Sequence, residues 1–129
     1  MKSVFKKGDR KKFSKIVVSD DVAAFHGQTV HDVCSTFALA RDVEWTTRQF
    51  VLEMKDDDEE GIGTFLTIQH TSPAFIGEEV VISGTVDELK GHELICSFEA
   101  KVGDRLIASG QTGQKILKKE KINSLFKKP

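Results

Sequence analysis

A single long helical pattern, followed only by strand patterns, constrains the fold of this chain more than any other feature. From Phe37 to Met54 the apolar side chains recur at intervals of three and four residues, the spacing of one helix face. Ser35 is a suitable N-cap, and the acidic run 56–60 followed by Gly61 ends the pattern. The sequence therefore predicts one long helix with a broad apolar face. Its predicted members are Phe37, Ala40, Val43, Thr47, Phe50, Val51 and Met54.

The rest of the chain after Gly63 has the alternating pattern of strands. Tight turns are indicated at Lys90-Gly91 and Gly103-Asp104. A short strand at 13–18 precedes the helix, and 19–34 is predicted as loop or a short helical turn. The predicted later strands are 64–70, 78–87, 92–101 and 105–117. This order predicts an α+β fold in which an antiparallel sheet of about five strands packs on the helix.

The length of 129 residues fits a single domain covering 1–129. An apolar fraction of 39% and a charged fraction of 30% are typical of soluble globular proteins. No apolar run approaches the roughly 18 residues needed to span a bilayer, and no secretory leader is indicated. We therefore expect no membrane partner and a cytoplasmic location.

The net charge of −1 conceals an uneven distribution of charge. Thirteen of the 19 basic residues lie in residues 1–15 and 115–129, so the ends are basic and the body is acidic. The basic termini, 1–12 and 118–129, could receive the phosphates of a ligand or of nucleic acid. Equally, they could be solvated lysines that protect the sheet from aggregation.

Glu44 is the residue that fits the helix pattern least. It lies between Ala40 and Thr47, on or beside the apolar face, where an unpaired buried carboxylate is costly. One interpretation places it in solvent at the edge of the face, because a phase error of one residue rotates it by about 100°. The other holds it at the helix–sheet interface as a general base or nucleophile.

Thr36 and His70 carry similar alternatives. Thr36 precedes Glu44 by eight residues and is either a second capping residue or a hydroxyl that holds a carboxylate or oxyanion. His70 ends a predicted strand and is either a surface residue or a catalytic one. Two weaker features are His31 close to Cys34, a conceivable Cys–His nucleophile, and Cys34 with Cys96, predicted as buried free thiols.

Two segments of the chain together resemble a known family. Residues 33–45, VCSTFALARDVEW, and residues 63–77, GTFLTIQHTSPAFIG, are similar to the fluoroacetyl-CoA thioesterase-like branch of the hot-dog superfamily. The shared features are a Thr, a Glu-Trp pair eight residues later, and Gly-Thr followed by His-Thr and a Pro. The resemblance covers about residues 10–120. It implies a hot-dog fold, with one long central helix wrapped by the antiparallel sheet.

The resemblance also implies what the residues do. Thr36, Glu44 and His70 match the catalytic residues of the family. The implied substrate-binding positions are Gly63, Thr64 and Val30, where Gly63 matches a glycine that approaches the thioester and Val30 aligns near a gating Phe. Because Val30 replaces that Phe and Gln114 replaces an Arg of the last-strand motif, the resemblance does not extend to fluoroacetyl specificity.

The hypothesis from the sequence is therefore a thioesterase that hydrolyses a small acyl-CoA or related pantetheine thioester. The resemblance implies a homodimer, with a tetramer possible, an active site at the subunit interface, and no metal or cofactor besides the CoA of the substrate. The alternative is a non-catalytic hot-dog dimer that binds an acyl-CoA ligand or, through its basic termini, nucleic acid. A hot-dog dehydratase is a third possibility.

Overall fold

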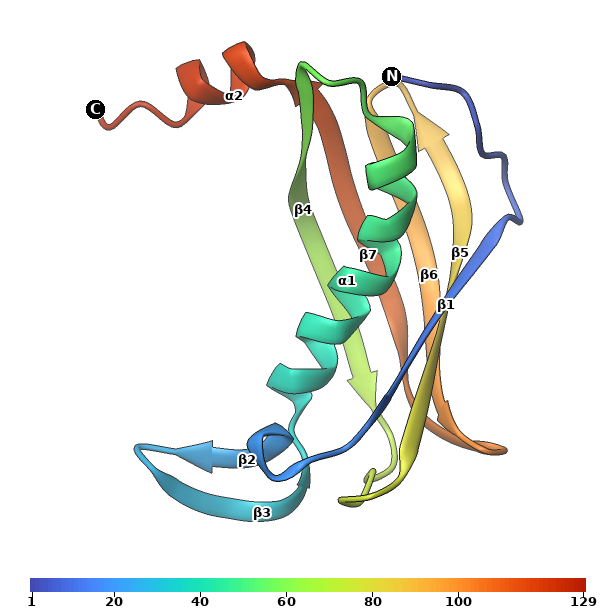
Figure 1. The fold of residues 1–129 in the computed structure, drawn as a ribbon, viewed down its shortest axis with the longest axis vertical. Coiled ribbons are helices and arrows are strands. Elements are labelled where there is room, and N and C mark those ends of the chain that lie inside the picture. The colour runs from blue at the N-terminus through green and yellow to red at the C-terminus, as the bar shows by residue number, and fades with distance from the viewer.

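The computed structural model describes residues 1–129 and shows one long helix packed on a five-stranded sheet, with a small hairpin to one side (Figure 1). The elements in chain order are β1 (Arg10–Ile16), the 3-10 helix η1 (Ser19–Asp21), β2 (Val22–Phe25), β3 (Gln28–Cys34), α1 (Thr36–Met54), β4 (Glu59–His70), β5 (Glu79–Lys90), β6 (Glu93–Val102), β7 (Arg105–Lys118) and α2 (Lys119–Leu125). The predicted α+β architecture is confirmed. Neither α-helix is long and apolar enough to cross a bilayer.

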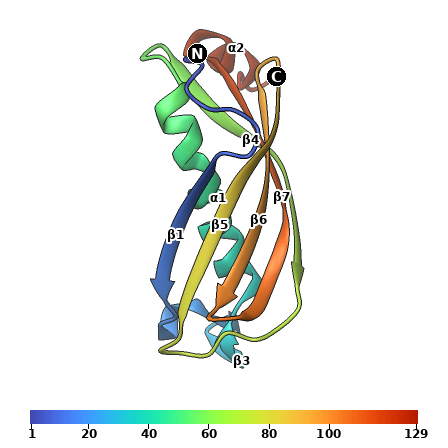
Figure 2. The same ribbon diagram turned by 90° about the vertical axis from the view of Figure 1, so that its right-hand side faces the viewer.

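The large sheet is antiparallel, with the strand order β1-β5-β6-β7-β4. β1 and β4 are therefore its two edges. The turns after β5 and β6 contain Gly91 and Gly103 with φ of 62° and 57°, a left-handed conformation that favours glycine. The sheet curves around α1, which lies against one of its faces (Figures 1 and 2).

The core lies between α1 and the inner face of the sheet. Leu39 and Val43 from the first half of α1 pack with strand residues such as Ile82, and Phe50 from the second half packs with Leu94. All of these side chains are buried, and each contributes roughly 1.5–3 kcal/mol by leaving water. This burial fixes which face of α1 points at the sheet.

One sequence prediction about this region was right only in part, and another was wrong. The segment 19–34, predicted as loop or a short helical turn, forms η1 and then the β2–β3 hairpin. Phe37, predicted on the apolar face, is 81% exposed. At 100° per residue, Phe37 lies about 160° around the helix from Leu39, so the two cannot face the same sheet. The end of the chain also forms the helix α2, which the sequence pattern did not reveal.

Candidate active site

The N-terminus of α1 is held in place by the residues that precede it. The Ser35 side chain accepts a hydrogen bond from the Ala38 N–H at 3.0 Å, which confirms Ser35 as the N-cap. The Ser35 N–H in turn donates to the Asp21 carbonyl at 2.7 Å. Thr36 is therefore the first residue of a well-anchored helix, beside backbone N–H groups that have no partner within the helix.

The structure brings Thr36 and His70 together. Thr36 Oγ1 lies 2.9 Å from His70 Nδ1, although 34 residues separate them. The other ring nitrogen of His70, Nε2, is buried and has no hydrogen-bond partner in the protein. A buried imidazole nitrogen without a protein partner can exchange a proton with a water or substrate atom placed against it.

Glu44 and Gly63 form a second pair. A Cβ atom placed on Gly63 would lie 3.0 Å from Glu44 Oε1, so the carboxylate rests directly against the glycine backbone. Glu44 is exposed and forms no ion pair; the nearby Arg48 is paired with Glu60 at 2.9 Å. Glu44 thus lies at the edge of the apolar face, as the first of the two interpretations from the sequence predicts. Its carboxylate contacts β4 at Gly63 instead of pointing into open solvent.

A β-bulge places these two pairs on the same side of the sheet. Gly63 pairs with Gln114 and His70 pairs with Ala108, both of which face α1. Simple alternation would put positions 63 and 70 on opposite faces, because seven residues separate them. The register of β4 against β7 shifts at Thr64, and this extra residue places positions 63 and 70 on the same, helix-facing side of the sheet.

One subunit does not bring all three predicted catalytic residues into contact. Eight residues along a helix correspond to about 12 Å, so Thr36 with His70 and Glu44 with Gly63 remain two separate pairs along β4. The other predicted substrate-binding residues lie away from them. The Thr64 hydroxyl donates to Glu93 at 2.9 Å on the outer face of the sheet, and Val30 is exposed on β3.

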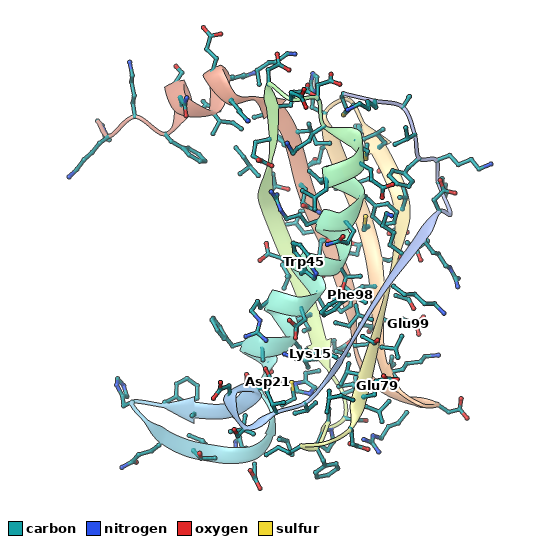
Figure 3. All side chains as sticks on the ribbon, in the orientation of Figure 1. Lys15, Asp21, Trp45, Glu79, Phe98 and Glu99 are labelled. Atoms are coloured by element: carbon teal, nitrogen blue, oxygen red, sulfur yellow. The ribbon has the colours of Figure 1, made fainter.

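An ionic cluster around the buried Asp21, which the sequence did not reveal, supports the site. Lys15 Nζ of β1 lies 2.8 Å from Asp21 and 3.1 Å from Asp42, and Arg41 lies 3.1 Å from Asp21 (Figure 3). Burial acts to raise the pKa of Asp21, but Lys15, the Val18 N–H and Arg41 together outweigh it and lower that pKa. The cluster joins β1, η1 and α1, and so fixes the helix end that carries Thr36.

The Cys34–His31 alternative is not supported by the geometry. Cys34 is buried and burial raises its pKa to about 11, so its thiol is protonated at neutral pH, while His31 is exposed on the hairpin. Burial likewise raises the pKa of Cys96 to about 12. Both cysteines are buried free thiols, which confirms the prediction for them.

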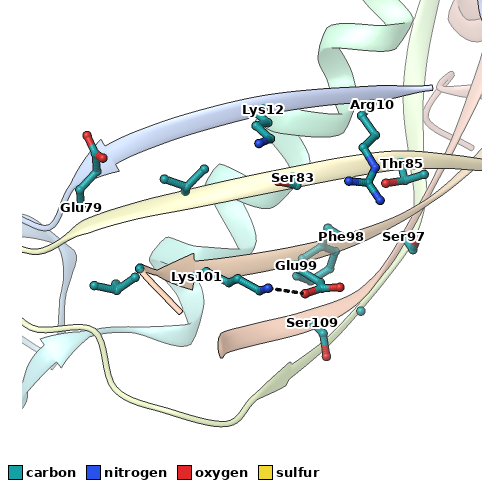
Figure 4. A pocket seen from close by; sticks show the side chains of 14 residues that line it. Arg10, Lys12, Glu79, Ser83, Thr85, Ser97, Phe98, Glu99, Lys101 and Ser109 are labelled. Atoms are coloured by element: carbon teal, nitrogen blue, oxygen red, sulfur yellow. Dashed lines mark ion pairs between the residues drawn. The ribbon is translucent and has the colours of Figure 1, made fainter. Parts of the chain in front are cut away.

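One hollow of the molecule lies away from these residues. It is an open groove of about 920 Å³ on the outer face of the sheet, over β1, β5, β6 and β7 (Figure 4). Its lining mixes basic residues such as Arg10 and Lys12 with acidic ones such as Glu99, which lies 3.6 Å from Lys101. It holds no His or Cys, and the sheet separates it from Thr36 and Glu44.

Comparison with solved structures defines the class of protein. A Thermus thermophilus protein described as a thioesterase superfamily member superposes with a TM-score of 0.89 at 28% identity, over 94% of this chain and 90% of that one. A hot-dog-like protein from Thermanaerovibrio acidaminovorans has a TM-score of 0.85 at 17% identity, over 97% and 96%. The fluoroacetyl-CoA thioesterase FlK has a TM-score of 0.84 at 20% identity, over 97% and 98%. The fold is thus the hot-dog fold of this superfamily.

The match to a family model is more specific than the similarity of fold. The model of the family described as FlK, fluoroacetyl-CoA-specific thioesterase, matches residues 17–120, and the chain belongs to this family. It is therefore a thioesterase of the hot-dog superfamily. Among curated proteins, no sequence matches this chain.

Proposed function

We propose that the chain hydrolyses small acyl-CoA thioesters as a homodimer, with Thr36, Glu44 and His70 as its catalytic residues. The observation that carries the proposal is the contact of 2.9 Å between Thr36 Oγ1 and His70 Nδ1, with His70 Nε2 buried and unpartnered. This pair shares one face of β4 with the carboxylate of Glu44. A hydroxyl, an imidazole and a carboxylate along one sheet edge are the groups that thioester hydrolysis needs.

The chemistry starts at the carboxylate. Glu44 either removes a proton from the water that attacks the thioester carbonyl or attacks that carbonyl itself. The C–S bond then breaks, and the CoA thiolate takes a proton from His70. In the second route, water cleaves the resulting anhydride and regenerates the carboxylate. Both routes give one carboxylic acid and one thiol, and Thr36 stabilises the oxyanion and orients the imidazole.

Gly63 is the substrate-binding residue that the geometry supports best. Its Cα lies against the Glu44 carboxylate, and a side chain at this position would occupy the space between β4 and α1. The backbone at Gly63 is exposed, so a thioester can approach it closely. Thr64 and Val30 have no comparable position in the single subunit.

The dimer is proposed because the site lies on an open edge. β4 is an edge strand, and from residue 61 to residue 69 it carries no charged side chain. Beside it, α1 exposes the large apolar residues Phe37, Trp45 and Leu52 at intervals of eight and seven. Pairing of β4 with β4 of a second copy would cover these groups and bring the catalytic pair of one subunit toward Glu44 of the other.

A panel of acyl-CoA substrates tests the proposal, with released CoA thiol as the readout and a dimer mass measured by sedimentation. FlK has been crystallised with acetyl-CoA, which makes acetyl-CoA and short-chain homologues the first substrates to try. We expect hydrolysis of at least one short acyl-CoA. Normal hydrolysis by both Glu44→Gln and His70→Ala would show that the mechanism is wrong. A single turnover in heavy-oxygen water tests the nucleophilic route, because heavy oxygen enters the Glu44 carboxylate only if Glu44 forms the anhydride and water attacks the Glu44 carbonyl of it.

A further inference from the structure

The C-terminal helix α2 leaves its apolar side uncovered. Ile122, Leu125 and Phe126 lie three and four residues apart and so share one side of the helix. Leu125 is 60% exposed and Phe126 is 68% exposed. Figure 1 shows that α2 leaves the end of β7 and extends past the β4 edge of the sheet. An apolar side held away from its own subunit needs another surface.

The β2–β3 hairpin extends past the same edge at the other end of β4 (Figure 1). All of its residues from 24 to 32 are exposed, including Phe25 at 68% and Val30 at 52%. Two apolar side chains on a projecting hairpin are again unpartnered within the subunit. The free edge of β4 is therefore flanked by one exposed apolar element at each end.

The two elements carry opposite charges. The segment 119–129 contains Lys119, Lys121, Lys127 and Lys128 with one Glu, and none of these lysines forms an ion pair. Some other basic residues near the ends are paired with acidic residues, for example Lys118 with Asp58 at 2.8 Å and Lys15 with Asp21 at 2.8 Å. The segment 19–34 contains no Lys or Arg, and its exposed acidic residues are Asp20 and Asp32, whereas Asp21 is buried and paired with Lys15. The two surfaces are thus complementary in charge as well as apolar.

Symmetry brings these two surfaces together. An antiparallel β4–β4 pair has its two-fold axis perpendicular to the sheet, so the end of one subunit that carries α2 meets the end of its partner that carries the hairpin. We infer that α2 of each subunit docks on the β2–β3 hairpin of the other, with Leu125 and Phe126 against the surface that includes Phe25 and Val30. This inference rests on the proposed dimer and adds a specific contact to it.

The contact has a consequence for the active site. The hairpin leads through Cys34 directly into Thr36, and the Cys34 N–H is tied to the Ala74 carbonyl at 2.8 Å. A helix from the partner that presses on the hairpin restricts its motion beside the Thr36–His70 pair. The C-terminal helix of one subunit thereby steadies the segment that leads into Thr36 of the other.

A disulfide between Phe25→Cys and Leu125→Cys tests the contact. Within one subunit the two positions lie at opposite ends of β4, whose 12 residues span roughly 40 Å, whereas a disulfide needs Cα atoms within about 7 Å. Any bond formed is therefore between subunits. The native thiols are buried and protonated and do not compete. The matched control pairs Leu125→Cys with Lys101→Cys, on the outer face of β6.

We expect the Phe25→Cys/Leu125→Cys protein to run mostly as a covalent dimer without reductant, and the control to remain monomeric on the same gel. A second variant, Leu125→Ser/Phe126→Ser, should weaken dimerisation by about tenfold to a hundredfold and speed proteolysis of the hairpin, with the main fold retained. A dimer by sedimentation that forms no covalent dimer would overturn this inference alone. A monomeric unmodified protein would overturn the proposed dimer as well.

Discussion

The two edges of the sheet, β1 and β4, differ in their charge. The β1 edge is protected against pairing with another chain, and the β4 edge carries the proposed active site. The β1 edge, RKKFSKI, carries four basic residues, and Lys11 and Lys15 are paired with acidic residues of α1 and η1. The β4 edge has no charge from residue 61 to 69 and carries Gly63, a bulge and His70. Lysines on an edge strand discourage pairing with another chain, whereas an uncharged edge invites it. One edge, the closed edge, is protected by charge, and the other, the open edge, is free for the second subunit and the substrate that we propose.

The largest expected effect concerns the chemistry at the open edge. Glu44→Gln keeps the size of the side chain but removes the negative charge, so thioester hydrolysis should fall by about a thousandfold or more with unchanged thermal stability. The measurement is kcat/KM for the best acyl-CoA substrate together with a melting curve. Glu99→Gln, in the groove on the outer face, is the control and should remain within about twofold of the unmodified protein. An equal loss in both variants would contradict an active site on β4.

Adding one positive charge to each edge tests whether β4, and not β1, pairs with the second subunit. Thr67→Lys places a lysine in the middle of the exposed β4 edge, where two copies would meet, and Ser14→Lys does the same on β1. Because like charges repel at an interface, the dimer dissociation constant should rise by about a hundredfold for Thr67→Lys only. Analytical ultracentrifugation measures this. If Ser14→Lys dissociated the dimer instead, β1 would be the interface.

The next effect concerns stability at the closed edge. Asp21→Asn removes the charge that Lys15 and Arg41 surround and should cost about 3 kcal/mol in the free energy of unfolding at neutral pH. The folded-state pKa of Asp21 is lowered, so its stabilisation is present above the unfolded pKa of about 4 and is lost as the pH falls through the lower folded value. Urea titrations at several pH values should show the two proteins converging in acid. A constant difference across pH would refute the ionic role.

A smaller effect should appear when the open edge is filled by one methyl group. Gly63→Ala puts a Cβ 3.0 Å from Glu44 Oε1 and so displaces the carboxylate by a few tenths of an ångström. We expect kcat/KM to fall by about tenfold, because the reacting group is misplaced, with little change in stability. Gly84→Ala is the matched control: its Cβ would lie 3.2 Å from a Thr47 methyl, its next neighbours belong to Thr46 and Phe50 rather than Glu44, and it should affect stability more than activity. The reverse result would remove Gly63 from the proposed site.

The smallest expected effect concerns the cysteines, which lie in the core behind both edges. Burial raises the pKa of Cys34 to about 11 and that of Cys96 to about 12, so a thiol reagent at pH 8 should label neither one in the folded protein. Both should react after addition of denaturant. Fast labelling of Cys34 in the native protein, with loss of activity, would revive the Cys–His alternative.

Sequence reasoning was sufficient for the helix and for the positions of the four later strands because both depend on local patterns. The buried residues of α1 recur at the spacing of one helix face, and the turns at Gly91 and Gly103 are glycine positions with positive φ. It failed for Phe37 and for the β2–β3 hairpin. For Phe37, the apolar residue type alone does not tell which helix face is buried. For the hairpin, the sequence lacks a clear alternation of apolar and polar residues.

The candidate site also combines features that the sequence predicts with features that only the tertiary structure shows. By itself, the sequence identified Thr36, Glu44 and His70 as candidates, through their spacing and a family resemblance. Both signals can be recognised within short segments of the sequence, without knowledge of the fold. The tertiary structure decided that Thr36 meets His70, that Glu44 rests on Gly63, and that Asp21 anchors the helix. The bulge at Thr64 is the clearest case, because one unpaired residue reverses the face on which everything after it lies. Such a shift depends on pairing with β7, which no stretch of β4 sequence contains.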